Sequence, residues 1–330
     1  MTSSHKGIRL ARLVLLYLGV FAIAVVVALR VHSRAAARDR TATSASAAPA
    51  KPAAPTDTSR SAPPASDTAA VTVASVRGSV ERSAGSPEGW EPLVTGAQLA
   101  ADESLRTGAG AAVELQVGDR ARIEVAERSQ LAVREVTRSV HRFRLARGRL
   151  SAEYGSDGTR LLRVEGADGE VVEASHGRVG VLQTGGSLTV AAQSGSATLH
   201  AAGRTVEIGA GLQVVAAHAS APSAAEPIPV DVLLRIANPD RPLPGDRTAR
   251  VRGTATPGTR VQVNGLPAEV DAAGSFAVVI PVRIGKNRVV AIVEDALGRT
   301  TRRTLPPIVI EPKADIRDVS IRWGKTDAPL

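Results

Sequence analysis

A chain of 330 residues with 43% hydrophobic content is long enough to build one or two ordinary cores. Aromatic residues make up only 2% of it, so these cores must consist of Val, Leu, Ile and Ala. The formal net charge of +9 is uneven, with +6 on residues 1–70, −1 on residues 71–217 and +4 on residues 218–330. No basic face with base-stacking aromatics and no groove-reading helix is visible, which excludes nucleic acid as a partner.

Residues 13–29 (LVLLYLGVFAIAVVVAL) form the one uncharged, almost wholly apolar run that is long enough to matter to a bilayer. As a helix the run measures about 25 Å, slightly short of a ~30 Å hydrocarbon core, and the flanking Arg12 and Arg30 can reach the head groups. We therefore predict a transmembrane helix over residues 13–29. A signal peptide cut near residues 35–37 and a buried globular helix are the alternatives.

The basic flanks of this run do not decide its orientation, because both carry arginines. Residues 30–70 are rich in Ala, Pro, Ser and Thr without hydrophobic period, which predicts a disordered stalk that spans roughly 35 Å. A stalk followed by β modules is typical of an exported region, whereas the absence of cysteine is neutral. We therefore expect residues 1–12 to be a cytoplasmic tail, residues 13–29 to anchor the chain in the inner membrane, and the rest of the chain to be periplasmic.

Residues 71–217 show short alternating apolar runs separated by glycine-rich turns, as at 112–117, 121–125, 179–182 and 197–200. Glycines, Gly148 and Gly195 among them, punctuate the runs. Many short strands without a long helical period predict an all-β domain, as a sandwich, a barrel or a solenoid.

Several spaced elements of this region agree in order with a known domain. They are Trp90, Pro92, Leu93, Gly96, Leu99, Leu105-Arg106-Thr107-Gly108, Val113-Glu114-Leu115, Gly148 and Leu150, and the final SGSATLHAAGRTVEIGAGLQVV. With these elements the region resembles the FecR domain over about 145 residues. One departure is Gly177-Arg178-Val179-Gly180-Val181, which stands where the family commonly shows Gly-Thr-x-Phe-x-Val.

The resemblance implies a periplasmic β domain. In the best-known members it relays a signal from a TonB-dependent outer-membrane receptor to a cytoplasmic sigma factor, through a helical anti-sigma domain that precedes the membrane segment. The twelve residues before the predicted helix are too few to fold such a domain. We therefore expect an exported module without that output, so that a relay would need a separate cytoplasmic or membrane partner.

A Pro-rich linker is predicted at residues 218–245 and a small immunoglobulin-like β-sandwich at 246–311, with 312–330 as a C-terminal strand or tail. Pro257-Gly258 suits a type II turn, and Asn264-Gly265 is a strong hairpin signal. The region resembles bacterial Ig-like modules first described as the B domain of glucodextranases. The shared elements are Gly253, Pro257-Gly258, Val261, Val263-Asn264-Gly265, Gly274-Ser275-Phe276, Gly285-Lys286-Asn287, Asp295 and Gly298.

No catalytic constellation rises above background. There is no cysteine nucleophile, nucleophile elbow, phosphate loop or metalloprotease motif, and the six histidines lack metal-ligand spacing. An acidic group, Glu165, Asp168, Glu170 and Glu173, is better read as a solvated face than as an acid pair. We therefore expect neither an enzyme, nor a metal site, nor a small-molecule cofactor.

A basic run between residues 138 and 149 is the one candidate site, in which Phe143 and Leu145 face away from the arginines beside them. Guanidinium groups suit an anionic polymer or lipid head groups, and an ordinary solvent face is the alternative. Arg247, Arg250, Arg252, Arg299, Arg302 and Arg303 in the second region permit the same interpretation. The candidate anionic-ligand face consists of Arg138, Arg142, Arg144, Arg147 and Arg149.

These features together predict a membrane-anchored periplasmic protein that acts as a non-catalytic binding or scaffolding module in the cell envelope. Its partner would be an envelope protein or a cell-wall polymer. The alternative is an envelope signal relay of the FecR type that acts through a separate partner.

Overall fold

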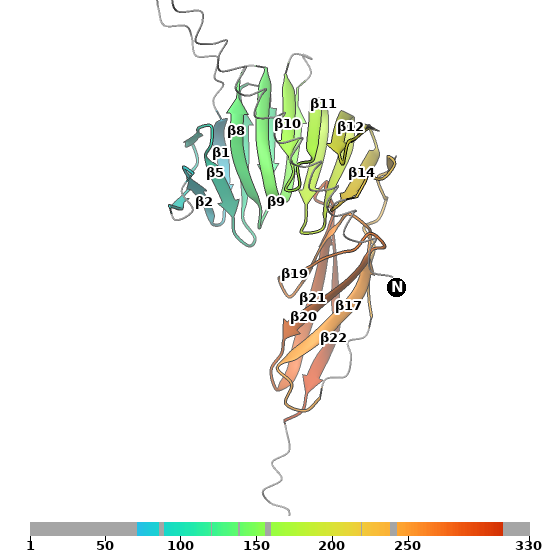
Figure 1. Cartoon of the computed structure of the whole chain (residues 1–330). Helices are drawn as coiled ribbons and strands as arrows, with labels where there is room; N and C mark the ends of the chain where they lie inside the picture. Colours follow the sequence, from blue (N-terminus) through green and yellow to red (C-terminus); the bar gives the residue numbers. More distant parts are fainter. Residues whose placement is uncertain are drawn as a thin grey trace, which may run out of the picture. The chain divides into compact units, whose positions relative to one another are not determined.

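The computed structural model (Figure 1) describes residues 71–85, 89–119, 121–137, 139–155, 160–218, 220–237 and 243–312. The predicted cytoplasmic tail, transmembrane helix, stalk and C-terminal strand or tail lie outside these ranges, as does Arg138. Within them the fold is all-β, as predicted. No helix in the described ranges is long and apolar enough to cross a bilayer.

Fifteen strands form the first module, residues 71–227, as one continuous sheet. They are β1 (Val71–Arg77), β2 (Val80–Ser83), β3 (Glu91–Pro92), β4 (Gln98–Leu99), β5 (Ser104–Thr107), β6 (Ala112–Val117), β7 (Ala121–Val125), β8 (Gln130–Val136), β9 (Val140–Tyr154), β10 (Leu161–Glu165), β11 (Val171–Gln183), β12 (Ser187–Ala201), β13 (Arg204–Gly209), β14 (Leu212–Ala217) and β15 (Glu226–Pro227). Strands β8 to β12 lie side by side in Figure 1.

The three longest strands of this module change partners half-way along. The first half of β9 pairs with β8 and β10, whereas residues 148–154 pair with β7 and β11. Strand β11 exchanges β10 for β9, and β12 exchanges β14 for β13. Because long strands belong to two sets of partners, the sheet folds over on itself and its two parts enclose one core.

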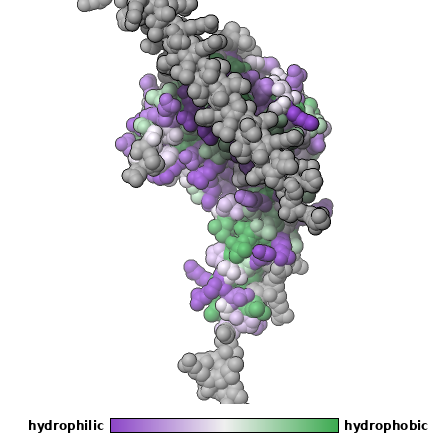
Figure 2. Space-filling model, viewed as in Figure 1, coloured by the Kyte–Doolittle hydropathy of each residue, from purple (hydrophilic) through white to green (hydrophobic). Residues whose placement is uncertain are grey.

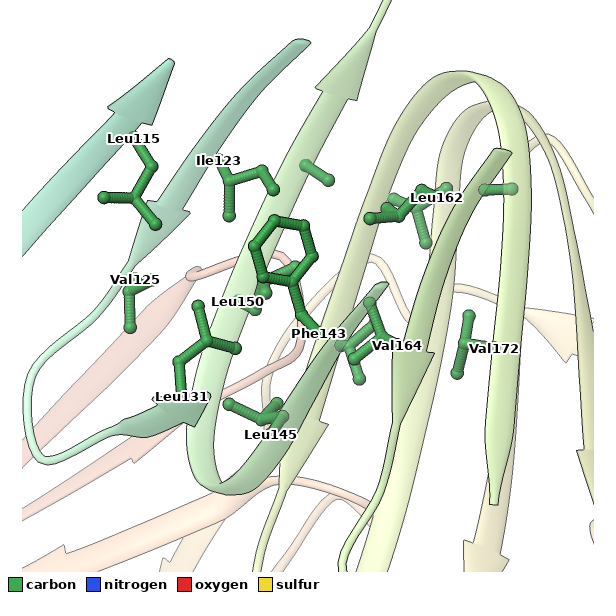
Figure 3. Packing of buried hydrophobic residues seen from close by; sticks show 14 of the residues in the cluster. Leu115, Ile123, Val125, Leu131, Phe143, Leu145, Leu150, Leu162, Val164 and Val172 are labelled. Atoms are coloured by element: carbon green, nitrogen blue, oxygen red, sulfur yellow. The ribbon is translucent and has the colours of Figure 1, made fainter. Parts of the chain in front are cut away.

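Side chains from both parts of the sheet fill this core (Figure 3). Leu131, Phe143 and Leu145 come from the part around β8, while Ile123 and Leu150 come from the part around β7, and all five are fully buried. Burial of each such side chain contributes roughly 1.5–3 kcal/mol. A core of aliphatic residues with few aromatics agrees with the composition.

Glycines bend two of the long strands where they change partners. Gly177 in β11 pairs directly with Gly195 in β12, and both have positive φ, 96° and 72°. A Cβ on Gly177 would lie 2.2 Å from the Ser194 carbonyl oxygen, and one on Gly195 would lie 2.4 Å from that of His176. The sequence pattern predicted separate short strands here, with Gly195 between two of them. In the structure this glycine lies within a continuous strand, which bends there.

The second module, residues 232–311, is a sandwich of two small antiparallel sheets around its own core. One sheet has the order β16-β17-β20 and the other β19-β18-β21-β22. Val251, Val261, Val263, Ile280 and Val289 are fully buried between them. The strands are β16 (Leu234–Ile236), β17 (Thr248–Ala255), β18 (Arg260–Val263), β19 (Leu266–Ala268), β20 (Ser275–Pro281), β21 (Gly285–Glu294) and β22 (Thr300–Ile310).

The turn signals of this module lie where the sequence places them. Asn264 and Gly265 connect β18 to β19 with φ of 48° and 79°, as a two-residue hairpin of type I′ requires. The segment 218–245, expected as a linker, supplies β15 to the first module and β16 to the second.

Candidate functional site

The predicted basic face lies on the outer side of β9. Arg144 and Arg147 are exposed and form no ion pair within the described residues, whereas Arg142 pairs with Glu165 at 2.6 Å. Arg149 is buried, with 7% of its surface exposed. It therefore does not belong to an open face, and the expected grouping is corrected at this position.

An irregularity in β9 explains the positions of these arginines. The pairing register with β8 shifts between Leu145 and Arg147, so two successive residues point outward. Buried positions are odd-numbered before the shift, as at Phe143, and even-numbered after it, as at Leu150. The shift keeps Arg149 on the outer side, where the second module covers it.

Buried charges gather at the contact between the two modules. Arg149 donates from Nε to Glu294 Oε1 of β21 at 2.9 Å and approaches Glu124 at 3.4 Å. Arg260 of β18 forms an ion pair with the other oxygen of Glu294 and donates to the Glu127 carbonyl oxygen at 3.0 Å. The exposed side-chain fractions of Arg149, Arg260 and Glu294 are only 9%, 11% and 12%.

Close backbone and apolar packing complete this contact. Leu182 and Ala191 of the first module pack against Ala296 of the second, and each is at most 2% exposed. The Thr189 hydroxyl donates to the Gly258 carbonyl oxygen at 2.7 Å. A Cβ on Gly180 would lie 2.2 Å from the Ala296 carbonyl oxygen, so the backbones approach as closely as glycine permits. Residues 63–330 accordingly form one compact unit.

Glu127 is the titratable group at this contact whose pKa is perturbed. Burial alone would raise the pKa of its carboxyl group. The Gly110 N–H, the Gln262 amide and the charges of Arg260 and Arg128 outweigh burial and lower it. Glu127 therefore stays ionised in mildly acidic solution and holds the β7–β8 turn against the second module.

Two grooves flank the contact. The larger, of about 1300 Å³, lies between the β14–β15 edge of the first module and the three-stranded sheet of the second. Mostly small side chains line it, with Phe276 as an aromatic. Its charged residues are Glu226, Glu269, Asp271, Arg235 and Arg252. The smaller, of about 380 Å³, is lined by Arg77 and Arg302 beside the ion cluster. Open, mixed-charge grooves of this kind suit a polypeptide better than a small cofactor.

The acidic residues noted in the sequence do not form an acid pair. Glu165 pairs with Arg142, Glu173 with Arg163, and Asp168 with His218. Glu170 is buried and accepts a hydrogen bond from the Asp168 N–H at 3.0 Å, which fixes the turn before β11. No cluster of potential metal ligands occurs among the described residues.

Sequence patterns gave no indication of the ion cluster. Arg149 and Glu294 are separated by 145 residues, and neither is part of a motif. Only the packing of β21 onto the outer side of β9 brings them together. Alternation along β9 places Arg149 on the side that faces solvent. Its burial, which marks the ion cluster, can be seen only in the folded structure.

Comparison with protein families identifies the middle of the first module. Residues 103–198 match the family model described as FecR protein. The match covers strands β5 to β11 in full and confirms the resemblance over this range. This match ends before the second module, whose Ig-like assignment stays a prediction.

Curated proteins give no match to this sequence. Among solved structures, two crystal structures of a candidate anti-sigma factor from Parabacteroides distasonis are similar to part of the chain, with TM-scores of 0.34 and sequence identities of 10% and 8%. Each alignment covers 38% of this chain and 59% of the other protein. The chain thus spans under two thirds of the length of these neighbours.

Proposed function

We propose that this protein is a non-catalytic component of an envelope signal relay of the FecR type, which acts by binding a separate partner protein. The observation that carries the proposal is the FecR domain at residues 103–198. The buried Arg149–Glu294–Arg260 cluster supports it, because it joins both modules into one body that a partner can displace as a whole. The predicted anchor and periplasmic location belong to the same proposal.

The groove of about 1300 Å³ is the place where we expect the partner's chain. A photo-crosslinking residue is introduced in cells at Ala272 or Ala277, which are exposed and line the groove, and at Ala202 as an exposed control outside it. The expected result is a discrete crosslinked partner from the two groove positions and none from the control.

Transcription provides the second readout. Deleting the protein should change the expression of a set of genes, and the full chain should restore it, whereas a chain carrying Glu294→Gln should restore it only partly. The relay is refuted if expression is unchanged by deletion and no partner is crosslinked from the groove. A reporter enzyme that is active only after export, fused after residue 330, tests the periplasmic location separately.

A second candidate function is scaffolding on an anionic cell-wall polymer. Arg144 and Arg147 favour it, because they are exposed and have no ion-pair partner among the described residues. In this case residues 63–330 should sediment with isolated cell walls at low salt. Arg144→Gln with Arg147→Gln should weaken the binding, and Arg178→Gln with Arg204→Gln, two exposed arginines of the same module, should not. Failure to sediment at low salt would exclude this function.

A further inference from the structure

The end of the second module that points away from the first has a surface of its own. Glu294, the last residue of β21, contacts Arg149, so Gly285 at the other end of β21 lies about 30 Å away at roughly 3.3 Å per residue. The backbone bonds Val282 N–H to Arg247 and Gly245 N–H to Glu311 bring the neighbouring segments to the same end. We call this the far end of the second module.

The outer side of the three-stranded sheet is basic. Arg235 of β16 and Arg250 and Arg252 of β17 are exposed there, while the alternate residue Val251 is buried in the core. Arg250 and Arg252 stand two residues apart on one strand, about 7 Å. None of the strands β16, β17 and β20 contains an acidic residue. Arg235 and Arg252 line the larger groove beside three acids, Glu226, Glu269 and Asp271. Arg250 is therefore the arginine of this side that continues toward the far end.

More cations continue this surface onto the far end. Arg247, Arg283 and Lys286 are exposed there and form no ion pair within the described residues. Two described acids face them. Asp246 accepts a hydrogen bond from the Leu243 N–H at 2.7 Å, and Glu311 is exposed. Among the residues that the structure describes, the cations therefore outnumber the acids at this end as well.

Large apolar side chains are exposed among these cations. Leu243 is 70% exposed, Ile284 60%, Val309 51% and Val279 49%. Val279 pairs with Arg250 across β17 and β20, and Val309 pairs with Lys286 across β21 and β22. Figure 2 shows hydrophobic and hydrophilic areas next to each other on this module. The cations of this surface attract phosphate groups, and the exposed aliphatic side chains beside them favour contact with an apolar phase over contact with water.

We propose that the far end of the second module, together with Arg250 on the adjoining sheet side, docks onto an anionic lipid bilayer. Guanidinium groups match lipid phosphates, and basic residues near a charged bilayer gain attraction that salt weakens. Leu243 and Ile284 would enter the boundary between head groups and acyl chains, where apolar area adds to the attraction. A soluble polyanion offers nothing to these apolar side chains, which is why the bilayer is the better fit.

The test uses residues 63–330, which form one compact unit with its own two cores and omit the apolar run at 13–29. This protein is sedimented with phosphatidylcholine vesicles that contain or lack phosphatidylglycerol, across a salt series. Binding is expected only with the anionic vesicles, and it should weaken as salt rises. Arg247→Gln with Arg250→Gln should lower the affinity about tenfold or more.

Further variants separate the two parts of the surface. Leu243→Asn with Ile284→Asn should weaken binding to vesicles but leave its salt dependence. Arg247→Lys with Arg250→Lys should retain binding, and Arg178→Gln with Arg204→Gln in the first module should leave it unchanged. Circular dichroism of each variant confirms that the modules are folded.

Three results would overturn the proposal. They are no binding to anionic vesicles, equal binding to neutral vesicles, and full competition by soluble polyphosphate with no effect of the apolar variants. The last result would identify a soluble polyanion as the ligand. None of these outcomes depends on the partner protein or the transcriptional response, so the relay and the bilayer contact fail or stand independently.

Discussion

The two modules use their charges in opposite ways. In the first, cations and anions are paired across neighbouring strands, as in Arg122–Glu114 and Arg142–Glu165, and between loops, as in Arg160–Asp119, each at 2.6 Å. In the second, β16 and β17 carry exposed arginines and no acidic residue, and the exposed Arg247, Arg283 and Lys286 form no ion pair among the described residues. Residues 71–217 contain 16 basic and 17 acidic residues, and residues 218–330 contain 16 and 12. The charges of the first module compensate one another, whereas the surplus cations of the second are available to a ligand outside the chain.

The hydrophobic cores of the two modules also differ, in size and in the way the strands enclose them. Long strands that serve two sets of partners hold the first module around one large core, while two small sheets hold the second around a smaller one. Both modules bury polar side chains, such as His141 and Glu170 in the first and Gln262 and Asp295 in the second. The four predictions below test how far the modules are separate bodies and how firmly they are joined.

The largest effect is expected from Phe143→Ala in the first core. Phe143 is fully buried, and such truncations cost about 3–5 kcal/mol through lost burial and the cavity left behind. Amide hydrogen exchange should show the loss of protection mainly in the first module. Equal loss in both modules would show that they unfold as one cooperative unit, and would contradict the expectation that each core unfolds separately.

Glu294→Gln should affect the junction between the modules. It leaves the mostly buried Arg149 and Arg260 without their shared carboxylate, at a cost of about 3 kcal/mol in the free energy of unfolding. Urea unfolding measures this cost, and faster proteolysis between the modules should accompany it. Arg122→Gln breaks an exposed pair and should cost under about 1 kcal/mol. Equal effects of the two variants would refute the special role of the junction.

Gly180→Ala should loosen the same junction without any change of charge. The new Cβ would meet the Ala296 carbonyl oxygen at 2.2 Å, so we expect a loss of about 1–3 kcal/mol. Gly186→Ala is the matched control, because nothing lies within 4 Å of the place that its new Cβ would occupy. Thermal unfolding of both variants is the measurement, and a neutral Gly180→Ala would mean that the modules are not in close contact there.

Acid should weaken the first module alone, because the second contains no histidine. Burial lowers the pKa of His141, the Arg160 charge lowers it further, and the His141 Nδ1 is hydrogen-bonded to the Tyr154 hydroxyl. Since the folded-state pKa lies below the ordinary 6.5, stability is complete above pH 6.5 and decreases as the pH falls below it. Urea unfolding between pH 5 and 7 should show this slope, and His141→Gln should remove it.

His218 provides a control of opposite sign. A hydrogen bond to Asp168 raises the pKa of this exposed histidine, so its contribution is present below pH 6.5 and lost as the pH rises through the raised value. His218→Gln should therefore leave the acid-side slope of the first module intact. A slope that survives in His141→Gln would assign the acid sensitivity to another group.

Sequence reasoning predicted the all-β class, the FecR resemblance that the family match confirms over residues 103–198, and the hairpin at Asn264-Gly265. These features depend on local alternation and turn chemistry. It divided β11 and β12 into shorter strands, because a glycine in a strand has the same local pattern whether the chain turns or only bends. It also placed Arg149 on an open face, because alternation tells which side of a strand is outward but not what covers that side.

The pairing of Gly177 with Gly195 has an evolutionary consequence. Each glycine is partly exposed, yet a methyl group on either would collide with the backbone of the neighbouring strand. Selection should therefore hold both positions nearly fixed in any descendant that keeps the two long strands, and should remove changes at one unless the other strand is rebuilt. Invariance at these two positions would record how the sheet is bent, and it should not be mistaken for the imprint of a ligand.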